Sequence, residues 1–179
     1  MIAYHVVTER PMSLGQRIVF DEDHHSGVYQ RVMALEDTVR DVYVHPEKYP
    51  VPLEHHLDVA LREFAMEQVR REKFPQYPSR MASLYVSETL EEAQRWADFF
   101  VSVGRPTFSI VKVSTEGRSF AGNACNCFDG TSDLSANLAM AERYWMNLPN
   151  EEDGFIREVL LDGVITVEEI IREINANLP

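Results

Sequence analysis

The sequence predicts a single α+β domain over residues 1–179, and three observations support this fold class. Short runs rich in β-branched and aromatic residues, typical of strands, occur at the start, middle and end of the chain, and segments with helical apolar spacing lie between them. The length of 179 residues suits one domain and allows a sizeable core. Hydrophobic residues make up 45% of the chain and charged residues 26%, the composition of a folded globular protein.

The first half of the chain is expected to hold two strands followed by two helices. Pro11 and Gly15 mark a turn between the strands, and three prolines within residues 45–52 separate the helices. Both helices are predicted from apolar residues that recur every three or four positions. The expected elements are residues 2–7 (strand), 17–20 (strand), 28–43 (helix) and 53 to about 73 (helix).

The second half is expected to alternate strands and helices around one long, functional loop at residues 115–132. Thr89 with Glu92, and Thr166 with Glu169, match the capping box that opens a helix. Gly104 is expected to end the first of these two helices. The expected elements are residues 83–87 (strand), 90–103 (helix), 107–113 (strand), 134–145 (helix, with Tyr144 and Trp145 in the core), 155–161 and 164–165 (a hairpin turning at Asp162-Gly163) and 167–174 (helix).

The charge and cysteine content narrow the expected partners and location. A formal net charge of −12 is opposite to the basic surface that binds nucleic acid or anionic membranes, so neither partner is expected. Glu9 and Arg10 end the first apolar stretch too early for a signal peptide, and no apolar run is long enough to span a membrane. Cys125 and Cys127, the only cysteines, are too close together to staple the fold, which favours a cytoplasmic location and reduced thiols. No histidine or cysteine spacing matches a known metal site, so no metal is expected.

Three polar side chains occupy strand positions that their neighbours do not explain. His5 shares a strand face with apolar residues, and Tyr85 lies between two serines. Glu158 shares its strand face with Ile156 and Leu160, which are both apolar. A carboxylate in such company lies at a sheet edge or has a specific partner, because burying it alone is costly. Each residue alone is typical of a satisfied core side chain or a rim carboxylate. The three together, on separate strands, indicate a site.

Three segments carry a family resemblance. Residues 4–8 (YHVVT), 83–97 (SLYVSETLEEAQRWA) and 158–170 (EVLLDGVITVEEI) together resemble the three-part layout of the ADP-ribosyltransferases. The chain is most similar to the branch that uses His, Tyr and Glu, near the small rifampin ADP-ribosyltransferases, as a bacterial family of its own that shares that fold. The resemblance implies a split pair of small β-sheets with inserted helices, and NAD bound as co-substrate in the cleft.

The resemblance also implies a role for each matching residue. His5, with Thr8 after it, would bind the ribose, and Tyr85 would stack on the nicotinamide ring. Glu158 would be catalytic, stabilising the positive charge that grows at C1′ as nicotinamide leaves. Arg80, just before Tyr85, would grip the diphosphate. The implied reaction is transfer of ADP-ribose to an unknown acceptor, or NAD hydrolysis.

Two departures from the family pattern keep other functions open. Val6 follows His5 where the family has glycine, which leaves less room for nicotinamide. Ile156 stands two residues before Glu158, where arginine-modifying relatives carry Glu or Gln, so arginine is not an expected acceptor. The alternatives are a catalytically degenerate module that binds NAD or an ADP-ribose-like molecule, and a non-enzymatic interaction protein that keeps only the fold.

Overall fold

A computed structural model describes residues 1–8, 10–150 and 156–174 and confirms the α+β class. The helices are α1 (Gly27–Met33), α2 (Glu36–Val44), α3 (His55–Lys73), α4 (Leu90–Ser102) and α5 (Leu134–Trp145), with short 3₁₀ turns η1 (Pro46–Lys48) and η2 (Ala124–Asn126). The strands are β1 (Ile2–Val7), β2 (Arg17–Phe20), β3 (Leu84–Val86), β4 (Ser109–Thr115), β5 (Ser119–Asn123), β6 (Arg157–Leu161) and β7 (Gly163–Glu173).

The strands form two small antiparallel sheets. One has four strands in the order β1-β4-β7-β2, and the other has three in the order β3-β6-β5. The sheets meet at β1 and β3, where Tyr4 and Ser87 exchange two backbone hydrogen bonds of 2.9 and 2.8 Å. The strands that carry His5, Tyr85 and Glu158 (β1, β3 and β6) are therefore consecutive neighbours across this junction.

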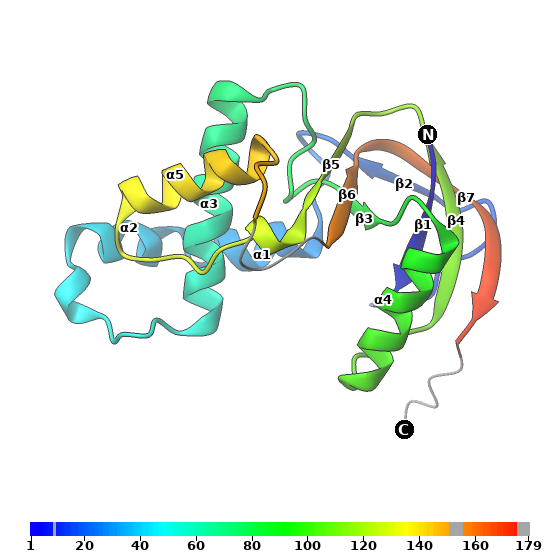
Figure 1. Cartoon of the computed structure of the whole chain (residues 1–179), viewed down its shortest axis with the longest axis horizontal. Helices are drawn as coiled ribbons and strands as arrows, with labels where there is room; N and C mark the ends of the chain where they lie inside the picture. Colours follow the sequence, from blue (N-terminus) through cyan, green and yellow to red (C-terminus); the bar gives the residue numbers. More distant parts are fainter. Residues whose placement is uncertain (9, 151–155, 175–179) are drawn as a thin grey trace.

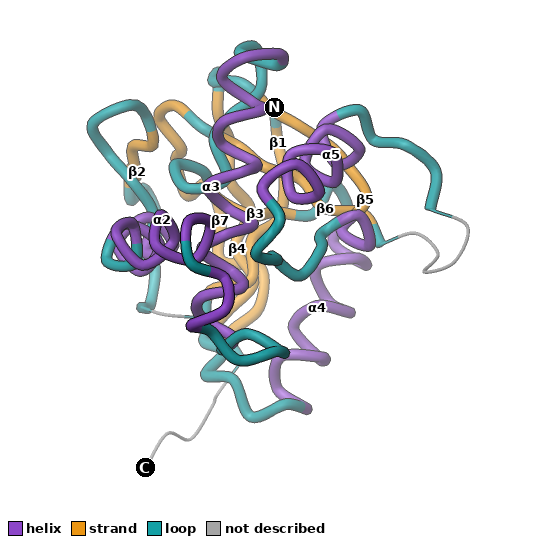
Figure 2. Tube along the Cα trace, turned by 90° about the vertical axis from the view of Figure 1, so that its left-hand side faces the viewer, coloured by secondary structure: helices purple, strands orange, loops and turns teal. Residues whose placement is uncertain are grey.

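The helices cover the sheets on two sides (Figure 1). Helices α3 and α5 pack on the three-stranded sheet around Phe120, Trp145 and Leu160, and α1 and α2 pack on α3. Helix α4 covers the four-stranded sheet through Ala93 and Ala97. Figure 2 shows α2, α3 and α5 in front of the strands, with α4 apart from them. No helix in the described ranges has the length and apolar composition needed to cross a membrane.

Strand β6 alternates between two cores, and this alternation sets the direction of Glu158. Val159 and Leu161 lie in the core between the two sheets, whereas Leu160 packs toward α3 and α5. Because strand side chains alternate, Glu158 lies on the same face as Leu160 and points toward the helices. The expected face is confirmed, but the strand is central in its sheet rather than at an edge.

Most elements expected from the sequence are present. The strands near residues 2–7, 17–20, 83–87 and 107–113 and the helices at 134–145 and ending at Lys73 are confirmed. The capping box of Thr89 and Glu92 opens α4, and Gly104 follows its end with a φ of +74°. Tyr144 and Trp145 are buried in the core. The expected helix at 28–43 is instead two helices, because the chain turns at Ala34 and Leu35 between α1 and α2.

The expected helix at residues 167–174 is wrong, since residues 167–173 belong to the long strand β7 and Ile174 follows its end. The capping-box residues Thr166 and Glu169 are present, but Thr166 pairs with both β2 and β4, and Glu169 pairs with β4. Val164, Ile165 and Val167 favour a strand through their branched side chains. Ladder bonds to β4 along the strand, and to β2 at its start, outweigh a local helix signal.

The expected loop at 115–132 and the expected hairpin at 155–165 are also wrong. The loop region contains β5, which pairs with β6. Strands β6 and β7 do not pair with each other, because the chain passes from one sheet to the other at Asp162 and Gly163. Phe155, part of the expected strand, lies outside the described residues.

Two of the chain crossings between the sheets, from β4 to β5 and from β6 to β7, meet at one corner. This corner is formed by Thr115, Gly117, Arg118, Asp162 and Gly163. The buried Asp162 carboxylate accepts from Arg118 N at 2.6 Å and from Arg118 Nε at 2.8 Å, and Thr115 Oγ1 donates to Asp162 O at 2.8 Å. Gly117 lies so close that a Cβ there would stand 2.1 Å from Asp162 O, and Gly163 has a φ of +78°. The corner fixes the three-stranded sheet to the four-stranded one.

Candidate functional site

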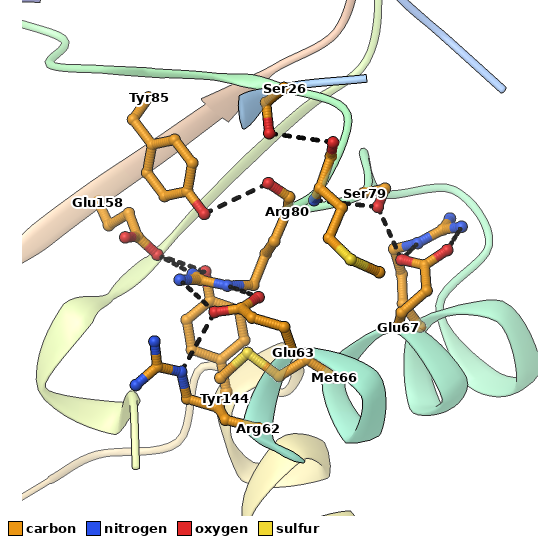
Figure 3. Close-up of polar contacts among 12 residues, drawn as sticks. Ser26, Arg62, Glu63, Met66, Glu67, Ser79, Arg80, Tyr85, Tyr144 and Glu158 are labelled. Carbon is orange, nitrogen blue, oxygen red and sulfur yellow. Dashed lines mark hydrogen bonds and ion pairs between the residues drawn. The ribbon is translucent and has the colours of Figure 1, made fainter. Parts of the chain in front are cut away.

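The candidate site is built around Arg80, which is buried between two carboxylates (Figure 3). Arg80 Nε donates to Glu63 Oε2 at 3.0 Å, and Arg80 Nη1 donates to Glu158 Oε1 at 2.5 Å. Glu63 comes from the buried face of α3, and Arg80 from the segment between α3 and β3. We call Glu63, Arg80, Tyr144 and Glu158 the Arg80 network.

Tyr144, near the end of α5, completes the Arg80 network. Its hydroxyl donates to Glu158 Oε1 at 2.5 Å and accepts from Arg80 Nη1 at 2.6 Å. The guanidinium also lies over the Tyr144 ring, 4.9 Å from its centroid. Burial raises the pKa of the Tyr144 hydroxyl well above its usual range, and Glu158 raises it further although Arg80 lowers it. The hydroxyl therefore keeps its proton and acts as a donor to Glu158.

The charges of the Arg80 network are balanced by a second arginine. Arg62 Nε donates to Glu63 Oε1 at 3.1 Å, so two arginines face two glutamates. Burial raises the pKa of Glu63, but Arg80 and Arg62 lower it more, which places it below its ordinary 4.5. Burial lowers the pKa of Arg80, while Glu158 and Glu63 raise it well above its usual value. A buried charge is tolerated only with such partners.

Glu158 is held through only one of its two oxygens. Arg80 and Tyr144 both bind Oε1, while Oε2 accepts no hydrogen bond from the residues that the structure describes. The side chain keeps 15% of its surface exposed. One oxygen thus fixes the carboxylate in place, and the other remains available to a ligand.

Contacts link the side chains of Tyr85 and Glu158 to Arg80, and His5 contacts the main chain of Tyr85. His5 Nδ1 lies 2.8 Å from the carbonyl oxygen of Tyr85. The Tyr85 hydroxyl donates to Arg80 O at 3.4 Å, a long bond, and the Arg80 Cζ atom lies 5.4 Å from the Tyr85 ring centroid. Thr8 follows the end of β1, half-buried, and the described contacts do not tie it to the Arg80 network. That Arg80 grips a diphosphate stays a prediction, and its guanidinium already pairs with two carboxylates.

Sequence reasoning missed Glu63 and the role of Tyr144. Glu63 is only 2% exposed and lies on the helix face that also buries Ala60 and Met66. A carboxylate within the buried stripe of a helix is the signal that was available. The expected core position of Tyr144 is confirmed. The sequence does not predict that its hydroxyl binds Glu158 and Arg80.

A pocket of about 250 Å³ opens beside the Arg80 network, between α1 and α3. Its wall includes Glu63, Arg80 and Tyr85, together with Arg31 and Arg62. No group of three or more histidine, cysteine or acidic side chains in the described part of the chain is placed to hold a metal ion. The arrangement therefore suits a ligand that binds through polar and aromatic contacts.

Comparison with known proteins gives the family of the chain. Residues 3–173 match a family described as a protein of unknown function, DUF2441, and the chain belongs to this family. Among curated proteins, none matches the sequence.

Proposed function

We propose that the protein transfers ADP-ribose from NAD to an acceptor molecule, or to water, with Glu158 as the catalytic residue. The observation that carries this proposal is the Glu158 carboxylate, which Arg80 and Tyr144 hold by one oxygen while the other is free of described partners. A fixed carboxylate with an available oxygen is suited to stabilising a positive charge that develops beside it.

The proposed chemistry uses this oxygen at the ribose of NAD. The bond between C1′ and the nicotinamide nitrogen breaks, and its electron pair leaves with nicotinamide, which becomes neutral. Positive charge grows on the ribose ring, where Glu158 stabilises it. A lone pair of the acceptor, or of water, then forms the new bond to C1′, and the acceptor loses its proton to solvent.

The order of the strands supports the remaining roles. His5, Tyr85 and Glu158 come from three neighbouring strands at the junction of the two sheets, the layout that the resemblance to ADP-ribosyltransferases implies. In the proposal His5 and Thr8 bind the ribose, and Tyr85 stacks on nicotinamide. Arg80 holds Glu158 in position.

A second candidate function is a module that binds NAD or an ADP-ribose-like molecule without turnover. The ion pair between Arg80 and Glu158 favours it, because a carboxylate that is 85% covered and paired resembles a structural group. The two functions differ in one measurable quantity, the release of nicotinamide.

The test measures NAD binding and nicotinamide release for the wild type and for Glu158→Gln. Glutamine keeps the shape but removes the charge that acts in the transition state, so we expect binding within about tenfold and a loss of roughly 100-fold or more in release. Glu67→Gln is the matched control: Glu67 is also buried and bound by Arg70 and Ser79, but it does not contact the Arg80 network.

The outcomes separate the candidates. Binding without release by the wild type supports the module, and an absence of NAD binding refutes both functions. If Glu158→Gln loses its far-ultraviolet circular dichroism, Tyr85→Ala replaces it as the test, with weaker NAD binding expected. Equal losses for Glu158→Gln and Glu67→Gln would refute the catalytic role.

A further inference from the structure

The pocket beside the Arg80 network has a cationic wall and an apolar wall. Arg31 and Arg62 contribute the cationic groups that face it in addition to Arg80, the His56 ring adds a polar group, and Val28, Val32 and Val59 contribute the apolar surface. Glu63 is the one carboxylate in the lining, and it is already bound by Arg62 and Arg80.

The arginines of the pocket are not equally occupied. Arg80 gives its Nε and Nη1 to the Arg80 network. Arg62 uses Nε for Glu63 and Nη1 for the carbonyl of Phe128, so its Nη2 has no described partner. Arg31 forms no ion pair within the described ranges and is exposed at the end of α1. The N–H donors and the positive charge of Arg31, and the Nη2 donors of Arg62, are therefore available to a ligand in the pocket.

The positive charge of this pocket contrasts with the net charge of the whole chain, which is −12. Arginine forks suit phosphate and carboxylate groups, which they bind through paired N–H donors. The volume of about 250 Å³ lies below the roughly 300–1,000 Å³ of ordinary ligand pockets, so it suits a small compound and not a whole dinucleotide.

We propose that this pocket binds a small organic anion, with its phosphate or carboxylate group at Arg31 and Arg62 and its carbon atoms against the valines. The ligand is a compound separate from NAD. This inference rests on the charge and size of the pocket and does not require the proposed function. If ADP-ribosyl transfer also holds, the anion is the acceptor, because Tyr85 and Arg80 belong both to the pocket wall and to the site around Glu158.

The experiment titrates the protein with inorganic phosphate and with succinate, following melting temperature and heat of binding at constant ionic strength. For the wild type we expect a saturable rise with at least one of the two anions. Arg31→Gln is expected to weaken this binding by about tenfold, the scale of one lost charge-assisted hydrogen bond. Arg40→Gln is the matched control, since Arg40 is also exposed but lies on α2 and pairs with Glu36.

Three results would overturn the proposal. They are no saturable binding of either anion, equal affinities for Arg31→Gln and Arg40→Gln, and a response that sodium chloride reproduces at the same ionic strength. A titration with NAD present tests whether the pocket binds a separate anion or the diphosphate of NAD itself. If NAD abolishes the binding of phosphate or succinate, the pocket belongs to the diphosphate of NAD and the proposal of a separate ligand is refuted. If NAD and the anion bind together, the separate ligand is supported. Absence of nicotinamide release would leave these measurements unaffected.

Discussion

Removing the Tyr144 hydroxyl tests whether the Arg80 network stabilises the fold as its geometry indicates. Tyr144→Phe keeps the ring, which packs against Phe120 and Trp145, and deletes one oxygen. That oxygen donates to Glu158 Oε1 at 2.5 Å and accepts from Arg80 Nη1 at 2.6 Å. The change therefore removes hydrogen bonds to two charged groups and leaves a vacancy no larger than the oxygen.

The expected magnitude follows from the charge of the partners. A hydrogen bond to a charged group contributes about 1.5–3 kcal/mol, and one between neutral groups about 0.5–1.5 kcal/mol. Tyr43→Phe is the matched control, because the Tyr43 hydroxyl accepts from the neutral amide of Asn137 at 2.9 Å. For a chain of this size, the loss of one such bond corresponds to a drop in melting temperature of about 3–12 °C, and the loss of both to up to about twice that drop.

The assay is urea unfolding at pH 7, followed by far-ultraviolet circular dichroism, for both variants and for Tyr144→Phe combined with Glu158→Gln. We expect Tyr144→Phe to cost at least about 1 kcal/mol more than Tyr43→Phe. In the Glu158→Gln background the cost of Tyr144→Phe is expected to shrink, since the charge that strengthens the bond is gone. Equal costs for the two tyrosines, or an unchanged cost in that background, would refute the reasoning.

Two further predictions concern pH and the corner between the sheets. Burial raises the pKa values of Glu63 and Glu67, but their arginine partners lower them further, below the ordinary 4.5. A carboxyl whose pKa is lower in the folded state than in the unfolded state stabilises the fold above its unfolded-state pKa, and this stabilisation is lost as pH falls through its folded-state pKa. The free energy of unfolding should therefore decline below about pH 4.5. A urea midpoint that stays constant from about pH 7 to about pH 3 would contradict this. Gly117→Ala places a Cβ 2.1 Å from Asp162 O and is expected to cost about 3 kcal/mol or more. Gly104→Ala, with a φ of +74° in open space, should cost only about 1–2 kcal/mol, and similar melting temperatures for the two variants would disprove the close contact.

Local patterns predicted the elements whose neighbours agree with them. The capping box at Thr89 is used as expected, because α4 lies on a sheet face and its apolar stripe meets Val6 and Ile110. The same pattern at Thr166 fails, because residues 163–173 form a strand that pairs with β2 at residues 163–166 and with β4 from Ile165 onward. A window of a few residues contains the capping signal but not the two strands, which come from distant parts of the chain.

The site was predictable only in part, for the same reason. Alternation along β6 showed that Glu158 needs either an edge or a partner, and the structure supplies Arg80 as that partner. The sequence indicates Arg80 through its position before Tyr85, but its pairing with a residue 78 positions away depends on the packing of α3 and α5 over the sheet. Glu63 is not predicted, because the apolar stripe of its helix is apparent from the leucines and not from the buried acids.

The corner between the sheets also limits which residues its positions can accept. Position 115 needs a hydroxyl that both donates to Asp162 O and accepts from Gly117 N, which restricts it to threonine or serine. Position 117 has no room for a side chain, position 162 needs two carboxylate oxygens for Arg118, and position 163 needs a left-handed backbone. DUF2441 relatives that cross between sheets in the same way are therefore expected to share a Thr/Ser-x-Gly motif and a later Asp-Gly pair. A relative without them must make this crossing with a different backbone path.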